Sequence, residues 1–97
     1  MDNLEKLLLG LLCNNYTTAD KVGRDVVGEY TIDTCDTVDC GWETAVWKAD
    51  NLDNMVIVAR YHNKDEASAG HAEWVKYCAE HKPTEVLSVQ TDEYETL

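Results

Sequence analysis

Residues 42–61 read WETAVWKADNLDNMVIVARY, and this stretch decides the fold. Two segments, Trp42–Lys48 and Met55–Tyr61, have the length and the β-branched and aromatic content of strands. Between them, residues 50–54 are rich in Asp and Asn, which favour turns. The simplest arrangement is an antiparallel hairpin. Because the second segment is apolar on both faces, we expect it to be central in a sheet.

Upstream of this hairpin the pattern changes twice. Residues 1–15 predict an N-terminal helix, because Asp2 and Glu5 have the spacing of a capping box. Its leucines recur at helical intervals, at Leu4, Leu7, Leu8, Leu11 and Leu12. A loop is expected over residues 17–25, then a strand from Val26 with alternating apolar positions. Residues 34–41 contain two aspartates and a glycine, which indicate a turn.

Downstream, residues 64–82 predict a second helix, with Asn63 as its N-cap and Pro83 as its stop. Its apolar face comprises Ala67, Gly70, His71, Trp74, Val75 and Cys78. A short edge strand over residues 86–89 and an acidic tail over residues 90–97 are expected. Residues 1–97 therefore predict a single α+β domain. Its three- to four-stranded antiparallel sheet over residues 26–61 carries the N-terminal helix and the second helix.

The charge of the chain is strongly unbalanced. Nineteen Asp and Glu face eight Lys and Arg, which gives a net charge of -11 and a pI near 4.4. Direct nucleic-acid binding is excluded, since phosphate backbones attract cations. Carboxylates on a folded surface imitate phosphates and would occupy the groove of a basic nucleic-acid-binding protein. The expected partner contacts are Asp36, Asp39, Glu43, Glu73 and Glu80. Alternatively, the acidity serves solubility only.

Cysteine and histidine spacing predicts a structural zinc site. Cys35 and Cys40 stand four residues apart, and Cys78 and His81 stand three apart at the end of the second helix. A turn and a helix end that each supply two ligands are typical of a Cys3His zinc site, which would stabilise a thin core. The alternatives are a Cys35–Cys40 disulfide, another ligand set that uses His71 or His62, or a buried apolar Cys78 beside a solvated His81 at the helix end.

No catalytic motif is present, so the chain is not expected to be an enzyme. His71 is interpreted as a packed histidine whose ring bonds a backbone or carboxylate group, and Gly70 lets the helix lie close to the sheet. The apolar run Leu4–Leu12 is too short to span a bilayer, and no secretion signal precedes it. We therefore expect a cytoplasmic protein with reduced cysteines and no membrane contact.

Residues 42–74 resemble a family of small proteins from phages and prophages of Firmicutes-type bacteria. Its pattern runs Y/W-E-T-A, a strand, E-A and G-H-x-x-W, matched here by Trp42–Ala45, Met55–Tyr61, Glu66–Ala67 and Gly70–Trp74. The resemblance implies a strand pair followed by a helix, and most members have no assigned function. Met55–Tyr61 and Gly70–Trp74 would then belong to the fold signature rather than to an active site.

In size, charge and apparent origin the chain also resembles anti-CRISPR proteins of type II systems. This resemblance implies an inhibitor that binds an effector such as Cas9 through an acidic surface and blocks DNA binding or cleavage. The alternative is a small structural or regulatory phage protein that acts by homo-oligomerisation. Both a monomer and a small homo-oligomer are compatible with the sequence.

Overall fold

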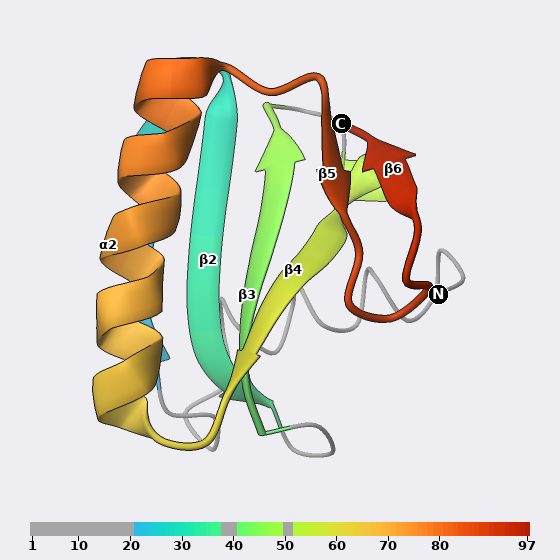
Figure 1. Cartoon of the computed structure of the whole chain (residues 1–97). Helices are drawn as coiled ribbons and strands as arrows, with labels where there is room; N and C mark the ends of the chain where they lie inside the picture. The colour runs from blue at the N-terminus through green and yellow to red at the C-terminus, as the bar shows by residue number, and fades with distance from the viewer. Residues whose placement is uncertain (1–20, 38–40, 50–51) are drawn as a thin grey trace.

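The computed structural model describes residues 21–37, 41–49 and 52–97. Its elements are β1 (Lys21–Val27), β2 (Tyr30–Thr37), β3 (Gly41–Lys48), the 3-10 helix η1 (Leu52–Asn54), β4 (Val56–Tyr61), α2 (Lys64–His81), β5 (Glu85–Leu87) and β6 (Tyr94–Thr96). Strands β1 to β4 form one antiparallel sheet in sequence order, and β5 and β6 form a second, two-stranded sheet (Figure 1). The fold is therefore α+β, whereas the predicted N-terminal helix over residues 1–15 lies outside the described residues.

The structure corrects the expectation for residues 21–37. β1 and β2 form a hairpin whose turn contains Gly28, at a positive φ of 58° that favours glycine. β2 continues to Thr37, so Cys35 and Asp36 lie within a strand rather than in a turn. Hydropathy missed both features because charged residues interrupt the apolar alternation of these strands. Arg24 is one example.

The hairpin predicted from residues 42–61 is confirmed. β3 pairs with β4 in antiparallel register from Trp42 opposite Tyr61 to Val46 opposite Val56. β4 is nevertheless an edge strand rather than a central one. β4 is apolar on both faces because the segment after β5 lies along it. Ile57 is buried, and its carbonyl accepts a hydrogen bond of 2.9 Å from the Val89 N–H. The segment after β5 thus covers part of this edge.

Helix α2 begins and ends where the sequence predicts. The Asn63 side chain accepts a hydrogen bond from the Glu66 N–H at 2.9 Å, which is the expected N-cap. Lys82 adopts the left-handed conformation and its N–H bonds the carbonyl of Cys78, which ends the helix before Pro83. The predicted apolar face packs on the sheet, with Ala67, His71 and Cys78 buried.

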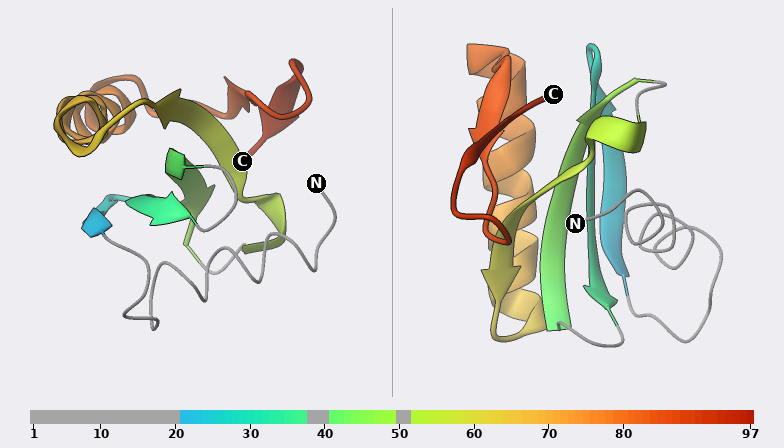
Figure 2. Two further views of the ribbon diagram at one scale, coloured as in Figure 1. Left: turned by 90° about the horizontal axis from the view of Figure 1, so that it is seen from below. Right: turned by 90° about the vertical axis from the view of Figure 1, so that its right-hand side faces the viewer.

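Residues 90–97 are not the loose tail that the sequence suggested. Tyr94–Thr96 pairs with β5, and Leu97 is buried with its N–H bonded to the Thr84 carbonyl at 3.0 Å. Figure 2 shows the β5–β6 hairpin and α2 on the same side of the four-stranded sheet. One core cluster lies between these layers: Tyr30, Ile32, Val46, Val56, Val58, Cys78, Val86 and Leu97.

A second cluster contains Cys35, Ala45, Trp47, Met55 and Ile57. Because side chains alternate along a strand, Ala45 and Trp47 point to the face opposite Val46. The sheet is therefore buried on both faces. The face that carries α2 will be called the helix face, and the other the opposite face.

Candidate functional site

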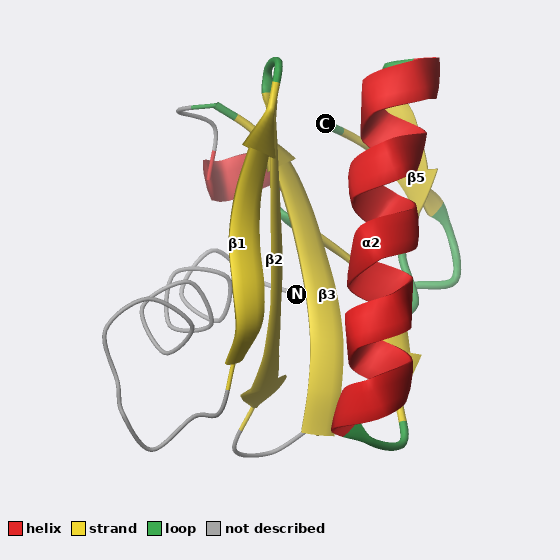
Figure 3. Cartoon of the chain, turned by 90° about the vertical axis from the view of Figure 1, so that its left-hand side faces the viewer, coloured by secondary structure: helices red, strands yellow, loops and turns green. Residues whose placement is uncertain are grey.

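The solvent side of α2 carries a row of three glutamates. Glu66, Glu73 and Glu80 are all exposed and stand seven residues apart. Seven residues are almost two helical turns, so the three side chains follow one line with a rise of about 10.5 Å between neighbours. Figure 3 shows α2 as a separate layer beside the sheet, which leaves this side of the helix uncovered by the other described elements. Lys76 is exposed on the same helix and partly offsets the negative charge.

An aromatic side chain lies within this row. Tyr77 is 41% exposed and is three or four residues from Glu73 and Glu80, which makes the three side chains neighbours on the helix surface. Its ring meets Trp74 edge to face at 5.3 Å and lies 4.8 Å from the ring of His81. Glu66, Glu73, Tyr77 and Glu80 will be called the acidic face of α2. A held aromatic ring flanked by carboxylates suits a cationic group.

The other acids predicted to contact a partner lie elsewhere. Asp36 is half-buried in β2, and Asp39 lies outside the described residues. Glu43 is 3% exposed and accepts a hydrogen bond of 2.7 Å from Arg60. Burial raises the pKa of the Glu43 carboxyl, while the Arg60 hydrogen bond and charge act to lower it. Glu43 is therefore an internal ion pair rather than a surface contact, which corrects its predicted role.

Both arginines of the chain neutralise buried carboxylates. Arg24 bonds Asp33, which is 1% exposed, at 2.6 Å, and Arg60 bonds Glu43. Among the described residues, only lysines and histidines are then left to offset the exposed acids of the surface. The acidic face of α2 therefore keeps a net negative charge.

The predicted zinc ligands are not brought together. Cys35 lies on the opposite face of the sheet, whereas Cys78 packs on the helix face, and His81 is exposed. Cys35 is disulfide-bonded, which differs from the expectation of reduced thiols, and its partner is outside the described residues. Cys78 is a free thiol whose pKa burial raises to about 11, and a protonated thiol is a poor ligand.

Within residues 21–37, 41–49 and 52–97, no group of three or more Cys, His, Asp or Glu could hold a metal ion. Cys40 lies outside these ranges, so the zinc site stays a prediction. It would require Cys35 and Cys78 to leave opposite faces of the sheet, and the proposal below does not depend on it.

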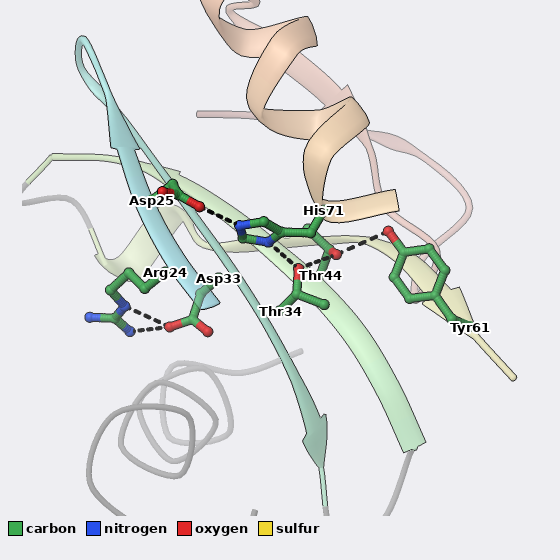
Figure 4. A network of polar contacts seen from close by, with 7 residues as sticks. All are labelled: Arg24, Asp25, Asp33, Thr34, Thr44, Tyr61 and His71. Carbon is green, nitrogen blue, oxygen red and sulfur yellow. Dashed lines mark hydrogen bonds and ion pairs between the residues drawn. The ribbon is translucent and has the colours of Figure 1, made fainter. Parts of the chain in front are cut away.

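A hydrogen-bonded chain on the helix face ties α2 to the sheet (Figure 4). His71 bonds the Asp25 carboxylate through Nε2 at 2.7 Å and the Thr34 hydroxyl through Nδ1 at 2.6 Å. The chain continues from Thr34 to Thr44 at 2.6 Å and from Thr44 to the Tyr61 hydroxyl at 3.0 Å. Because a carboxylate only accepts, Nε2 donates to Asp25, and in neutral histidine Nδ1 then accepts from Thr34. Thr44 can then donate to Thr34, and the Tyr61 hydroxyl to Thr44, so that every hydroxyl donates toward His71.

The hydrogen-bonded chain from Asp25 to Tyr61 serves the packing of α2 on the sheet. Thr34 and Thr44 are fully buried, so no substrate can reach a hydroxyl that His71 might activate. The prediction that His71 is a packed histidine bonded to a carboxylate is confirmed. A Cβ added to Gly70 would lie 2.3 Å from the Tyr61 ring, which confirms the close approach predicted for this glycine. The sequence pattern predicts a turn at Thr34, so it does not reveal the hydrogen bonds of the threonines.

Comparison of the chain with known protein families, curated proteins and solved structures found no match. No helix of the described residues has the length and apolar character needed to cross a membrane. A functional proposal must therefore be argued from the geometry and charge of this structure.

Proposed function

We propose that the protein is a stoichiometric inhibitor that binds a basic, nucleic-acid-binding protein in the bacterial cytoplasm. A CRISPR effector such as Cas9 is the candidate target, and the inhibitor would block DNA binding or cleavage without a catalytic step. The acidic face of α2 carries this proposal. Such effectors hold guide and target in strongly basic channels, and a row of carboxylates is attracted to the same channel as a phosphate backbone.

The packing of α2 supports this role. His71 bonds the helix to β1 and β2, and Asn63 caps its first turn. A surface that is already ordered loses little conformational entropy on binding. Tyr77 adds an aromatic group of the kind that anchors protein interfaces.

The test is binding to a purified effector–guide complex, measured by calorimetry at low and high salt. Glu73→Lys is expected to weaken binding by about tenfold or more, because it places a like charge against the basic channel. Asp53→Lys is the matched control, since it adds the same charge at an exposed position of η1, which lies on the side of the sheet away from α2 (Figure 3). It is expected to change the affinity by less than about threefold.

Two results would contradict the proposal. Equal losses for Glu73→Lys and Asp53→Lys would show that total charge matters and that the acidic face of α2 does not. The absence of binding to any CRISPR effector at low salt would remove the candidate target. Light scattering on the free protein would then examine the alternative, a homo-oligomer whose acidity serves solubility.

A further inference from the structure

The β5–β6 hairpin has one buried and one exposed face. Val86 and Ser88 are buried at 3% and 1%, whereas Leu87 between them is 44% exposed. Leu87 is the register partner of Tyr94, which is 67% exposed. Side chains directly opposite in an antiparallel pair lie on the same face, about 5 Å apart at Cβ. An exposed leucine and an exposed tyrosine therefore stand side by side on the outer surface of the hairpin.

Exposed apolar side chains concentrate at this hairpin. The large exposed hydrophobic residues of the described chain are Val26, Tyr77, Leu87, Val89 and Tyr94. Three of these five belong to the short segment that contains β5 and β6, although a solvated surface has no need for them. Leu87, Val89 and Tyr94 will be called the hairpin patch.

Acidic side chains border the hairpin patch. Glu85 lies two residues before Leu87 on the same strand, and Asp92 and Glu93 immediately precede Tyr94; all three are exposed. No lysine or arginine follows Lys82 in the sequence. The patch is therefore an apolar surface with a negative border.

The connection between β5 and β6 is held by its own hydrogen bonds. The Ser88 hydroxyl accepts from the N–H groups of Gln90 and Thr91 at 3.2 and 3.3 Å. The backbone of Ser88 bonds Asp92 and Glu93, both at 2.9 Å. The hairpin patch is thus ordered before any partner arrives, which lowers the entropic cost of docking.

We propose that the hairpin patch is a docking surface for a partner segment in which arginine or lysine alternates with apolar side chains. The apolar side chains would pack on Leu87 and Val89, and a cation would lie over the Tyr94 ring with the acidic border around it. A second copy of this chain is a poor occupant, because two negative borders would face one another. The inference rests on the proposed function only in expecting a basic partner.

The position of the patch is compatible with one partner that contacts both sites. The hairpin and α2 form the same layer over the sheet (Figure 2), and Val86, Leu97 and Cys78 share one core cluster. The acidic face of α2 would supply electrostatic attraction, and the hairpin patch would supply apolar contact.

The test is an NMR titration of the full-length, ¹⁵N-labelled protein with two synthetic peptides. One peptide consists of four Arg-Leu repeats and the other of four Arg-Ser repeats, so that both carry the same charge. We expect the Arg-Leu peptide to bind at least about tenfold more tightly and to shift the amides of Leu87, Val89 and Tyr94. Tyr94→Ser should remove most of this binding, whereas Val26→Ser, a change of another exposed apolar residue on β1, should retain it.

Equal affinity for the two peptides, or shifts that map outside the hairpin, would overturn the docking surface. Shifts of the hairpin amides with protein concentration alone would identify a second copy as the occupant and would overturn it equally. Leu87→Ser provides a second variant if Tyr94→Ser disturbs the fold. Glu73→Lys separates the two proposals, because it should weaken effector binding and leave the Arg-Leu peptide bound. Peptide binding without effector binding would keep the docking surface and reject the candidate target.

Discussion

The two faces of the four-stranded sheet bury polar side chains in different ways. On the helix face, Thr34, Thr44 and His71 satisfy one another in a hydrogen-bonded chain. On the opposite face, arginine side chains pair with the buried carboxylates (Figure 4 shows Arg24 with Asp33). The ion pairs join residues directly opposite on neighbouring strands, whereas the hydroxyl chain joins the helix to the sheet. The opposite face is thus specified by strand register and the helix face by tertiary packing.

This difference predicts different sensitivities to mutation. Removing one member of a buried ion pair leaves a charge in a poorly solvated place, which is a large penalty. Removing a neutral hydroxyl leaves hydrogen-bonding groups without a partner, which costs less. Substitutions on the two faces can therefore test the comparison directly.

The largest effect is expected for Arg24→Met, which keeps the apolar stem of the side chain and removes the charge. Asp33 is 1% exposed and would lose its arginine, and Trp47 would lose the cation that lies 4.9 Å from its ring. We expect a loss of about 3 kcal/mol in the free energy of unfolding, measured by urea denaturation. The double variant Arg24→Met/Asp33→Asn should recover part of this loss. Equal losses for the single and double variants would show that the buried charge is not the cause.

A smaller effect is expected on the helix face for Thr34→Val, which conserves shape and removes one hydroxyl. His71 Nδ1 and the Thr44 hydroxyl would each lose a buried partner. The expected loss is about 2 kcal/mol in the same measurement. Thr37→Val is the control. Thr37 lies on the same strand, and its hydroxyl donates to the Gly41 carbonyl, which is not part of the hydrogen-bonded chain of His71. Equal losses of unfolding free energy at the two positions would indicate that the hydrogen-bonded chain contributes no more to stability than a single threonine hydrogen bond.

Local signals were sufficient to predict the elements around residues 42–81. Asn63 and Pro83 bound the helix, and the strands of the hairpin show ordinary apolar content. β1 and the second half of β2 were missed because polar residues such as Arg24, which is partly buried, and Thr34, which is fully buried, are held by pairing rather than by hydrophobicity. Hydropathy cannot distinguish a buried, paired polar residue from a solvated one.

The candidate site was predictable only in part, for the same reason. Glu73 and Glu80 follow from the helical period, which places them on the solvent side. Glu43 resembles them in sequence, but its partner Arg60 is seventeen residues away and becomes visible only when the register of β3 and β4 is known. The hairpin patch was hidden because its acidic residues indicated a loose tail.

The third prediction concerns the end of the hydroxyl chain. Alanine is the better helix former by about 1 kcal/mol, so Gly70→Ala would ordinarily stabilise α2. Here the new Cβ would meet the Tyr61 ring, which must swing away from Thr44 and break their hydrogen bond. We expect a net loss of about 1 kcal/mol, measured by thermal unfolding. In a Tyr61→Val background the same substitution should be stabilising. A loss that persists there would place the clash elsewhere.

The smallest effect is expected for Glu43→Gln and appears as a change in pH dependence. Burial raises the pKa of Glu43 in the folded protein, so the fold binds this proton more tightly than the unfolded chain does. Its contribution to stability is therefore fully present below the ordinary glutamate pKa and is lost as pH rises through the higher folded value. Glutamine cannot ionise, and the other carboxylates are common to both proteins. The difference in unfolding free energy between variant and parent should therefore grow in favour of the variant as pH rises through this window.

Arg60 affects the size of this pH dependence of the stability difference. Its hydrogen bond and charge favour the ionised form of Glu43 and oppose the effect of burial. Urea denaturation of both proteins at a series of pH values separates these influences, because only the balance of the two fixes the sign. A difference that shrinks as pH rises would mean that Arg60 outweighs burial. The ion pair would then stabilise the opposite face at neutral pH.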